Sequence, residues 1–493
     1  MTSLWLDRER PMLAGSLPAG QHFDVVIVGA GLTGLTTALL LTRAGCSVAV
    51  LEGRRVGSGT TGNTTAKVSL LQGKRLSTIG RQHSKETVQR YVDANREGQS
   101  WLLRYCTEHD IAFQQRPAYS YAASEAGRKT VQDELTACEA AGLPAQWADD
   151  TELPYPVHGA VRLADQAQLD PMDVLIAMVD DVISRGGLVV ENSRVREIHP
   201  ARATTVVTDT GAVTADRVVL ATGTPIMDRG GFFARLEPLR SYASAFRVPG
   251  PIPDGMYLSV DSPTRSVRSV PSAAGQLLLT GGNGHVVGRR TPTSELVTDL
   301  NTWTKQHWPG AERTHVWSAQ DYHSIHELPY AGPLSPANSC VLVATGYDKW
   351  GMTNAGAAAL ALSSQILGGH TEWASVMKTW TTAEVAGALP AAKLNAKVGF
   401  ALTGGWIKPM LSTAERLPPA EGFGRIERDG ITPAAVCTVD GRTIRRSAIC
   451  THLHGVVSWN DAEHSWDCPL HGSRFAADGA VLEGPATEDL KPK

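Results

Sequence analysis

The sequence predicts an α/β body that takes up most of the chain, followed by a small all-β domain at the C-terminal end. Three observations predict this division. Near the start, a short run of β-branched residues leads into a glycine-rich turn and then a helical segment. The same order of strand, glycine-rich turn and apolar helix returns at residues 339–369. After about residue 414, short strands alternate with Asp-Gly turns, which are typical of hairpins.

Length and composition restrict the class of protein. A chain of 493 residues is too long for one compact domain, and its 42% hydrophobic content can bury a large core. The net charge of -3 shows no basic excess, so we expect no nucleic-acid partner. No apolar stretch approaches the ~20 residues of a spanning helix, so we expect no membrane span. The nearest stretch, 396–411, is interrupted by glycine and proline, which favours a docking or linker helix.

The cysteines and the first residues indicate the compartment. The chain has seven cysteines, an odd number, and most of them lie far apart in ordinary sequence. A disulfide framework is therefore not expected. The first twenty residues lack a charged segment followed by an apolar one, so we expect no signal peptide. Together these features favour a reducing, cytoplasmic location.

The first glycine-rich turn predicts a dinucleotide site. Phe23–Val28 is apolar on both faces, as a buried parallel strand requires, and it runs directly into the turn. In such a turn Gly29 makes the tight bend, Gly31 lets the backbone approach a pyrophosphate, and Gly34 permits close helix packing. Glu52 ends the next strand, 18 residues after Gly34, where a carboxylate accepts from a ribose hydroxyl. Three packing glycines in an ordinary turn are the weaker alternative.

Three later segments bear on the choice of dinucleotide. A Gly/Thr-rich loop at 57–67 can contact further phosphate and approach a flavin ring, and a strand at 216–224 ends in Ala-Thr-Gly. The segment 339–369 then repeats the strand, turn and helix. Spacing alone does not choose between FAD and NAD. The only lookalike of a second nucleotide turn, 277–289, lacks a following helix, so we expect a strand pair there and no nicotinamide site.

These segments, in this order, resemble the D-amino-acid oxidase/glycine oxidase/sarcosine oxidase group of FAD enzymes over about residues 20 to 375. The resemblance implies a Rossmann-like FAD-binding domain with an interleaved mixed-sheet substrate domain. It also implies that the ADP half of FAD binds at the first turn and the isoalloxazine at the last. Because no cysteine securely matches a covalent flavin link, we expect the FAD to be non-covalent. By position, the implied FAD-binding residues are Gly29, Ala30, Gly31, Gly34, Glu52, Gly53, Arg54, Thr60, Thr61, Thr65, Ala221, Thr222, Gly223, Gly346, Lys349, Trp350, Gly351, Met352 and Thr353.

The same resemblance gives the expected domain boundaries. The FAD-binding domain would comprise 1–90, 156–240 and 326–378, and the substrate domain 91–155 and 241–325. A linker at 379–413 would lead to the C-terminal domain at 414–493.

Four residues in the C-terminal domain form a metal-binding pattern. Cys450 and His452 are separated from Cys468 and His471 by residues 453–467. Two thiolates and two imidazoles suit either a structural zinc or a [2Fe–2S] cluster. The surrounding sequences, CTHLHG and CPLHGSRF, resemble the two cluster-binding loops of Rieske proteins. The resemblance implies that these four residues are the cluster ligands.

Departures from the Rieske pattern predict the potential of the cluster. Quinol-oxidising members carry a further cysteine in each loop, and here Gly455 and Leu470 stand at those positions. Ser473 is kept, but Phe475 replaces a tyrosine that would donate to cluster sulfur. Loss of a hydrogen bond lowers the potential, so we expect a value between the ferredoxin-like and quinol-oxidising types.

The resemblance implies oxidation of a C–N bond in an amine or amino acid. The candidate catalytic residues are Lys67, Tyr257, Arg268 and His285. A Lys67 ammonium would stabilise an anionic reduced flavin, although a pyrophosphate or surface lysine is the alternative. An arginine on a strand, such as Arg268, more often lies on a solvent-exposed face. His285 could simply make a hydrogen bond within a turn. Sarcosine-oxidising members hold the substrate carboxylate with an arginine just after the phosphate loop, and residues 64–69 contain none.

Two cofactors in one chain predict electron flow from a small-molecule substrate to the flavin, then to the cluster and to an external one-electron carrier, ferredoxin-like or other. The alternative runs inward, from a ferredoxin-type donor through the cluster, so that the flavin reduces or oxygenates a substrate. A non-enzymatic redox sensor is a third possibility. About 150 residues lie between the FAD motifs and argue against it.

Overall fold

The computed structural model describes residues 1–10, 12–13, 15–227, 229–272, 275–381, 406, 417–430 and 432–493. The linker expected at 379–413 and the helix expected at 396–411 therefore lie, apart from 379–381 and 406, outside the described residues. None of the helices in the described ranges is long and apolar enough to cross a bilayer.

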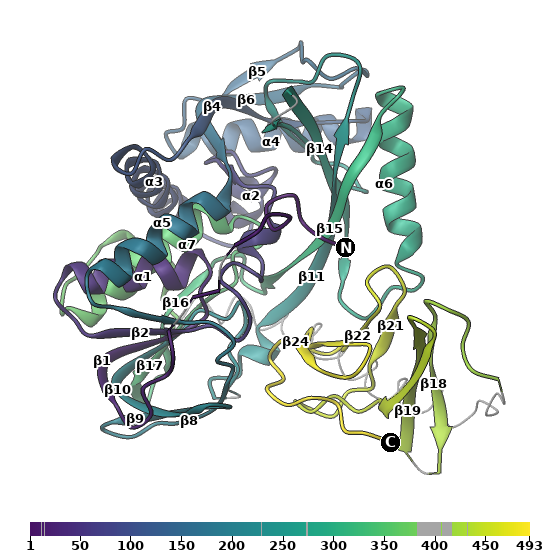
Figure 1. Cartoon of the computed structure of the whole chain (residues 1–493). Helices are drawn as coiled ribbons and strands as arrows, with labels where there is room; N and C mark the ends of the chain where they lie inside the picture. The colour runs from purple at the N-terminus through teal and green to yellow at the C-terminus, as the bar shows by residue number, and fades with distance from the viewer. Residues whose placement is uncertain are drawn as a thin grey trace.

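The first sheet has eight strands and forms the nucleotide-binding half of the body (Figure 1). Its main order is β16-β17-β10-β1-β2-β7, with β8 and β9 extending from β10. β1 pairs in parallel with both β10 and β2, so the carboxyl ends of these strands meet at one edge. The strands are β1 (His22–Val28), β2 (Val48–Leu51), β7 (Leu188–Val190), β8 (Val195–His199), β9 (Thr204–Thr208), β10 (Gly211–Leu220), β16 (Tyr330–Ser335) and β17 (Asn338–Thr345).

Four helices pack together beside this sheet: α1 (Leu32–Arg43), α3 (Lys85–Glu108), α5 (Pro171–Ser184) and α7 (Gly351–Ile366). α5 begins with a proline at its first turn, and the Asp170 side chain accepts from the Met172 N–H as its N-cap. α3 crosses α7 closely, because a Cβ on Gly98 would lie 2.2 Å from the Thr353 carbonyl oxygen. The tight crossing holds the N-terminal end of α7 in a fixed place.

The second sheet has nine strands in the order β15-β11-β14-β13-β12-β4-β6-β3, with β5 paired to β6. β6 lies within the range 156–240 that the sequence assigns to the FAD-binding domain, yet it pairs with β4 in this sheet. Residues 277–286 belong to β14, between β11 and β13. The strands are β3 (Lys67–Val68), β4 (Phe113–Tyr121), β5 (Gln146–Ala148), β6 (Ala160–Leu169), β11 (Leu236–Arg247), β12 (Met256–Ser259), β13 (Arg265–Ser272), β14 (Gly275–Val286) and β15 (Glu312–Ser324).

Helices α2 (Arg75–Gly80), α4 (Glu125–Ala140) and α6 (Ser294–His307) flank this second sheet. Short 3-10 helices lie at η1 (Thr61–Asn63), η2 (Phe232–Ala234) and η3 (Trp373–Met377).

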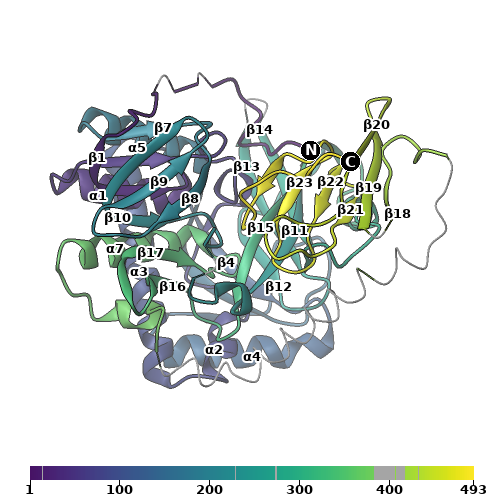
Figure 2. The same cartoon turned by 90° about the horizontal axis from the view of Figure 1, so that it is seen from below.

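The C-terminal domain consists of two small antiparallel sheets around its own core of Trp466, Phe475 and neighbouring apolar residues. It lies against β11 and β15 of the body, as seen from below in Figure 2. The fold is thus an α/β nucleotide-binding body with a mixed sheet, plus an all-β domain. Its strands are β18 (Gly424–Asp429), β19 (Thr432–Val439), β20 (Arg442–Ser447), β21 (Ser458–Asn460), β22 (Ser465–Asp467), β23 (Arg474–Ala476) and β24 (Val481–Glu483).

Candidate active site

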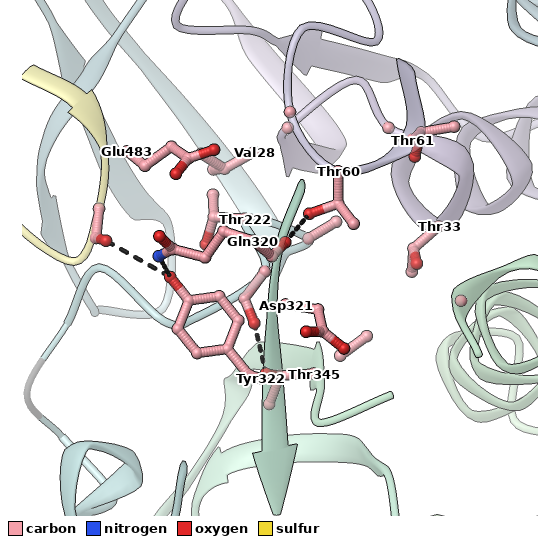
Figure 3. A pocket seen from close by; sticks show the side chains of 18 of the residues that line it. Val28, Thr33, Thr60, Thr61, Thr222, Gln320, Asp321, Tyr322, Thr345 and Glu483 are labelled. Atoms are coloured by element: carbon pink, nitrogen blue, oxygen red, sulfur yellow. Dashed lines mark hydrogen bonds between the residues drawn. The ribbon is translucent and has the colours of Figure 1, made fainter. Parts of the chain in front are cut away.

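A long cavity lies at the carboxyl ends of β1, β10 and β17 (Figure 3). The turn after β1 needs glycine at two positions. Gly29 has φ 105°, and a Cβ there would lie 2.6 Å from the Ala221 carbonyl oxygen. A Cβ on Gly34 would lie 2.0 Å from the Gly29 carbonyl oxygen. The turn therefore has the tight packing that a dinucleotide site requires.

Two helices point uncapped N-termini toward this cavity. The N-cap of α1 is Gly31 and that of α7 is Trp350, and neither helix has a side-chain cap. The Leu32 N–H at the start of α1 donates to Thr61 Oγ1 at 3.1 Å, and the positive ends of both helix dipoles are available to anionic groups. Glu52 holds the first turn, because its carboxylate accepts from the N–H of Ala30 and of Arg54, both at 2.9 Å. The donors and the glycine cradle fit the pyrophosphate and flavin of FAD.

Most of the predicted FAD-binding residues line the cavity. Ala30 and Gly34 lie behind the first turn, and Thr353 donates to Asn95 Oδ1 at 2.6 Å. Thr65 and Trp350 line a neighbouring cavity instead. Those that line the FAD cavity are Gly29, Gly31, Glu52, Gly53, Arg54, Thr60, Thr61, Ala221, Thr222, Gly223, Gly346, Lys349, Gly351 and Met352.

Further residues of the cavity wall carry no local motif. Arg194 comes from the loop before β8, and Gln320, Asp321 and Tyr322 come from β15. Five others belong to the C-terminal domain, within the segment 482–487. Nothing in the sequence around these positions marks them, because they reach the cavity only through sheet pairing and domain docking.

The neighbouring cavity has a volume of about 400 Å³, which is the size of a small-molecule site. It shares part of its wall with the FAD cavity, so a molecule inside it would lie beside the flavin. The shared residues are Thr60, Thr64, Asp321 and Lys349. We call this second space the substrate cavity.

Lys67, on β3, lines the substrate cavity. Its Nζ donates to the Tyr257 carbonyl oxygen and to Ser266 Oγ, both at 2.7 Å. Burial, with the nearby Arg268 guanidinium adding to it, lowers the pKa of Lys67 to about 7. Lys67 is therefore held in place at this wall and titrates near neutral pH.

The other three predicted catalytic residues do not line the substrate cavity. The Tyr257 hydroxyl donates to Glu152 at 3.0 Å, and its ring stacks on Tyr119. The Arg268 guanidinium donates to the carbonyl oxygens of Thr65 and Ala66, so it supports the loop from behind. His285 stacks on the Tyr242 ring at 5.7 Å. Their catalytic roles remain predictions.

Arg75 is the centre of an ion-pair cluster in the substrate cavity. Its Nη1 lies 2.5 Å from Glu327 Oε2 and 2.6 Å from Asp348 Oδ2. His323 lies 3.3 Å from the same Asp348 oxygen. His323, Glu327 and Asp348 are close enough together to hold a metal ion. The Arg75 guanidinium, however, already lies between the two carboxylates.

Asp321 lies on β15 and lines both cavities, and its side chain is labelled in Figure 3. Its Oδ2 atom is buried and has no hydrogen-bond partner. Burial raises the pKa of Asp321 to about 7, although the Lys349 ammonium lowers it in part. No local sequence pattern marks this residue.

The four predicted metal ligands come together in the C-terminal domain. Cys450 and Cys468 are 1% and 2% exposed, and the rings of His452 and His471 lie 5.2 Å apart. His471 Nδ1 is buried without a hydrogen-bond partner, so this nitrogen is available as a ligand. Burial also lowers the pKa of His471 to about 3, which keeps the imidazole neutral. Two thiols and two imidazoles on adjacent loops fit a Rieske [2Fe–2S] cluster.

Gly455 and Leu470 stand at the positions where quinol-oxidising Rieske proteins carry the two additional cysteines. A Cβ on Gly455 would lie 2.6 Å from the Leu470 side chain, so the two positions face each other without sulfur. Ser473 is fully buried, and its Oγ accepts from the Ala486 N–H at 3.0 Å. Phe475 is likewise fully buried and has no hydroxyl to donate.

The cluster loop docks directly on the wall of the FAD cavity. Gln320 lines that cavity, and its Nε2 donates to the Gly472 carbonyl oxygen at 2.8 Å. Gly472 follows the predicted ligand His471, whose ring lies 5.6 Å from Phe233 of the body. A single side chain thus separates the FAD cavity from the cluster loop.

Buried charges hold this docking. Arg240 on β11 is 3% exposed and pairs with Glu463 at 2.6 Å and Glu483 at 3.2 Å. Arg474 pairs with the same two carboxylates from inside the C-terminal domain. Buried ion pairs of this geometry favour one docked orientation over others.

Comparison with known proteins agrees with both halves of the site. A family model described as FAD dependent oxidoreductase matches residues 24–365, and a Rieske [2Fe-2S] domain model matches residues 410–492. The Rieske 2Fe-2S iron-sulfur protein YhfW of Bacillus subtilis (strain 168) is 31% identical over 483 residues, covering 97% of this chain and 95% of YhfW.

Two solved structures share the fold of the body. Glycine oxidase from Geobacillus kaustophilus aligns with a TM-score of 0.62 at 19% identity, covering 73% of this chain and 99% of that one. L-Proline dehydrogenase from P. horikoshii aligns with a TM-score of 0.58 at 19% identity, covering 72% and 96%. The chain therefore belongs to the family of FAD-dependent oxidoreductases, and it joins that body to a C-terminal Rieske [2Fe–2S] domain.

Proposed function

We propose that this oxidoreductase oxidises a C–N bond of an amine or amino-acid-like small molecule and passes the electrons through the Rieske cluster to an external one-electron acceptor. The observation that carries this proposal is the docking of the cluster loop on the FAD cavity through Gln320. This contact joins the wall of the FAD cavity to the loop of the cluster domain and so supports electron transfer between the two sites.

The bound groups would supply complementary chemistry: FAD takes two electrons from a substrate, and the cluster passes them on singly. The names of the structural neighbours, glycine oxidase and L-proline dehydrogenase, support a C–N substrate. A cavity of about 400 Å³ beside the flavin site suits a small molecule. Seven free cysteines support a reducing, cytoplasmic location.

The residues of the chain would position the substrate rather than react with it. Lys67 and Asp321 lie on the walls of the substrate cavity, and the Arg75 cluster closes another side of it. Lys67, when protonated, would favour negative charge on the neighbouring cofactor.

The test is an anaerobic titration of the purified holoprotein with a panel of amines and amino acids. We expect the flavin absorbance to bleach, followed by a Rieske EPR signal without any added reductant. An EPR signal that appears with dithionite but with no member of the panel would contradict the outward direction. Fast reduction of both cofactors by reduced ferredoxin would then favour the inward one.

A further inference from the structure

The substrate cavity holds one carboxylate without a cationic partner. Among the acidic residues that line it, Glu327 and Asp348 both pair with Arg75. Asp321 makes no ion pair within the described part of the chain, and its Oδ2 is buried without a hydrogen-bond partner. A buried carboxylate in that state is costly, so a ligand that supplies the missing partner gains affinity.

The lysines of the cavity leave this oxygen unpaired. Lys67 is held by two oxygen acceptors at 2.7 Å, away from Asp321. The Lys349 Nζ lies beside Gly284, 2.7 Å from where a Cβ would stand there. Neither ammonium reaches Asp321 Oδ2 within hydrogen-bond distance. Asp321, which lines both cavities, therefore has an acceptor that no cation of the described chain satisfies.

The position of Asp321 indicates which part of a ligand would meet it. The residue lines both the FAD cavity and the substrate cavity. A group bound to its carboxylate would thus lie at the junction, next to the flavin. A carboxylate ligand would be repelled there, whereas an N–H cation would complete an ion pair with charge-assisted hydrogen bonds.

We propose that Asp321 binds the ammonium group of the substrate, so that the site selects a cationic primary or secondary amine whose reacting end carries no carboxylate. This inference rests on the proposed function and narrows its substrate class. It agrees with the lack of an arginine in residues 64–69.

Binding can be measured without turnover by using tert-butylammonium as the probe. Its nitrogen-bearing carbon has no hydrogen, so the compound cannot be oxidised at the C–N bond. tert-Butanol has the same shape without charge, and pivalate replaces the ammonium by a carboxylate. For the full-length holoprotein, we expect the flavin spectrum to respond to tert-butylammonium at lower concentration than to either analogue.

Asp321→Asn keeps the size of the side chain and removes its charge. We expect it to weaken tert-butylammonium binding by about tenfold to a hundredfold, which is the usual contribution of a hydrogen bond to a charged group. Glu312→Gln is the matched control, since this carboxylate lies on the same strand, β15, and lines neither cavity. Equal binding of tert-butanol by the unaltered protein, or unchanged binding in Asp321→Asn, would overturn the inference.

The wild-type comparison of the three probes stays decisive even if Asp321→Asn fails to retain FAD. The two proposals also fail separately. If tert-butylammonium binds through Asp321 but no amine bleaches the flavin, amine oxidation is wrong and the cation site stands. If amines bleach the flavin equally fast in Asp321→Asn, the cation site is wrong and amine oxidation stands.

Discussion

Lys67 is an amine buried in the folded protein, and its pKa of about 7 has a consequence for stability. The folded-state pKa lies below the ordinary lysine value. Folding therefore opposes its protonation, and the stability lost to this group grows as the pH falls from the unfolded-state pKa of about 10.4 to about 7, below which it no longer changes. Replacement by an uncharged side chain removes that dependence.

We therefore expect Lys67→Met to raise the melting temperature relative to the wild type below pH 7, and to raise it less as the pH increases. Thermal unfolding followed by circular dichroism between pH 6 and 9 measures this. Lys74→Met is the control, because Lys74 lines the same cavity but is exposed. A difference in melting temperature that does not vary with pH would contradict the buried-amine explanation.

Phe475 gives a prediction for the cluster. Phe475→Tyr places a hydroxyl where other Rieske proteins donate to cluster sulfur, so we expect a higher potential. The wild-type potential should lie below roughly +300 mV, the top of the Rieske range. An EPR-monitored redox titration measures both. Phe233→Tyr is the control, since Phe233 contacts His471 from the body side; an equal shift in both variants would count against a specific hydrogen bond.

At the scale of elements, β11 carries the main link to the cluster domain. Arg240→Met would leave Glu463 and Glu483 with Arg474 as their remaining buried cation. We expect a loss of roughly 3 kcal/mol in the free energy of unfolding, typical of a broken buried pair. Denaturant unfolding followed by the visible circular dichroism of the cluster measures it. Arg290→Met is the matched surface control, with an exposed partner and an expected loss of roughly 1 kcal/mol or less.

The elements also show what the sequence could predict. The first nucleotide turn and the four predicted cluster ligands lie in short stretches of the chain, so local patterns suffice to predict them. Asp321 and Gln320 reach the site because β15 pairs with β11, a contact that no local pattern encodes. Tyr257 illustrates the same limit, since the hydroxyl of this β12 residue points to Glu152 rather than into the cavity.

The fold class was predictable for a similar reason. Strand and helix order follow from local periodicity, whereas the assignment of β6 to the second sheet follows from its pairing with β4. Domain boundaries drawn along the chain therefore miss elements that change sheets.

At the scale of the whole molecule, Gln320 connects the two cofactor sites. Gln320→Ala removes the side chain between the FAD cavity and Gly472, so we expect slower cluster reduction with unchanged flavin bleaching. Stopped-flow absorbance during anaerobic reduction by substrate separates the two steps. Ser318→Ala is the control, because this β15 residue contacts Arg240 but does not line the cavity. Equal rates in Gln320→Ala and the wild type would place the electron path elsewhere.

The wall of the FAD cavity formed by residues of the segment 482–487 has a consequence for biogenesis. Because that wall belongs to the cluster domain, the cavity is complete only once this domain has folded and docked. Retention of the flavin nucleotide would then depend on iron–sulfur assembly in the same chain. Under iron limitation, newly made chains would accumulate with an open flavin cavity, and the supply of one metal would set the yield of both redox centres.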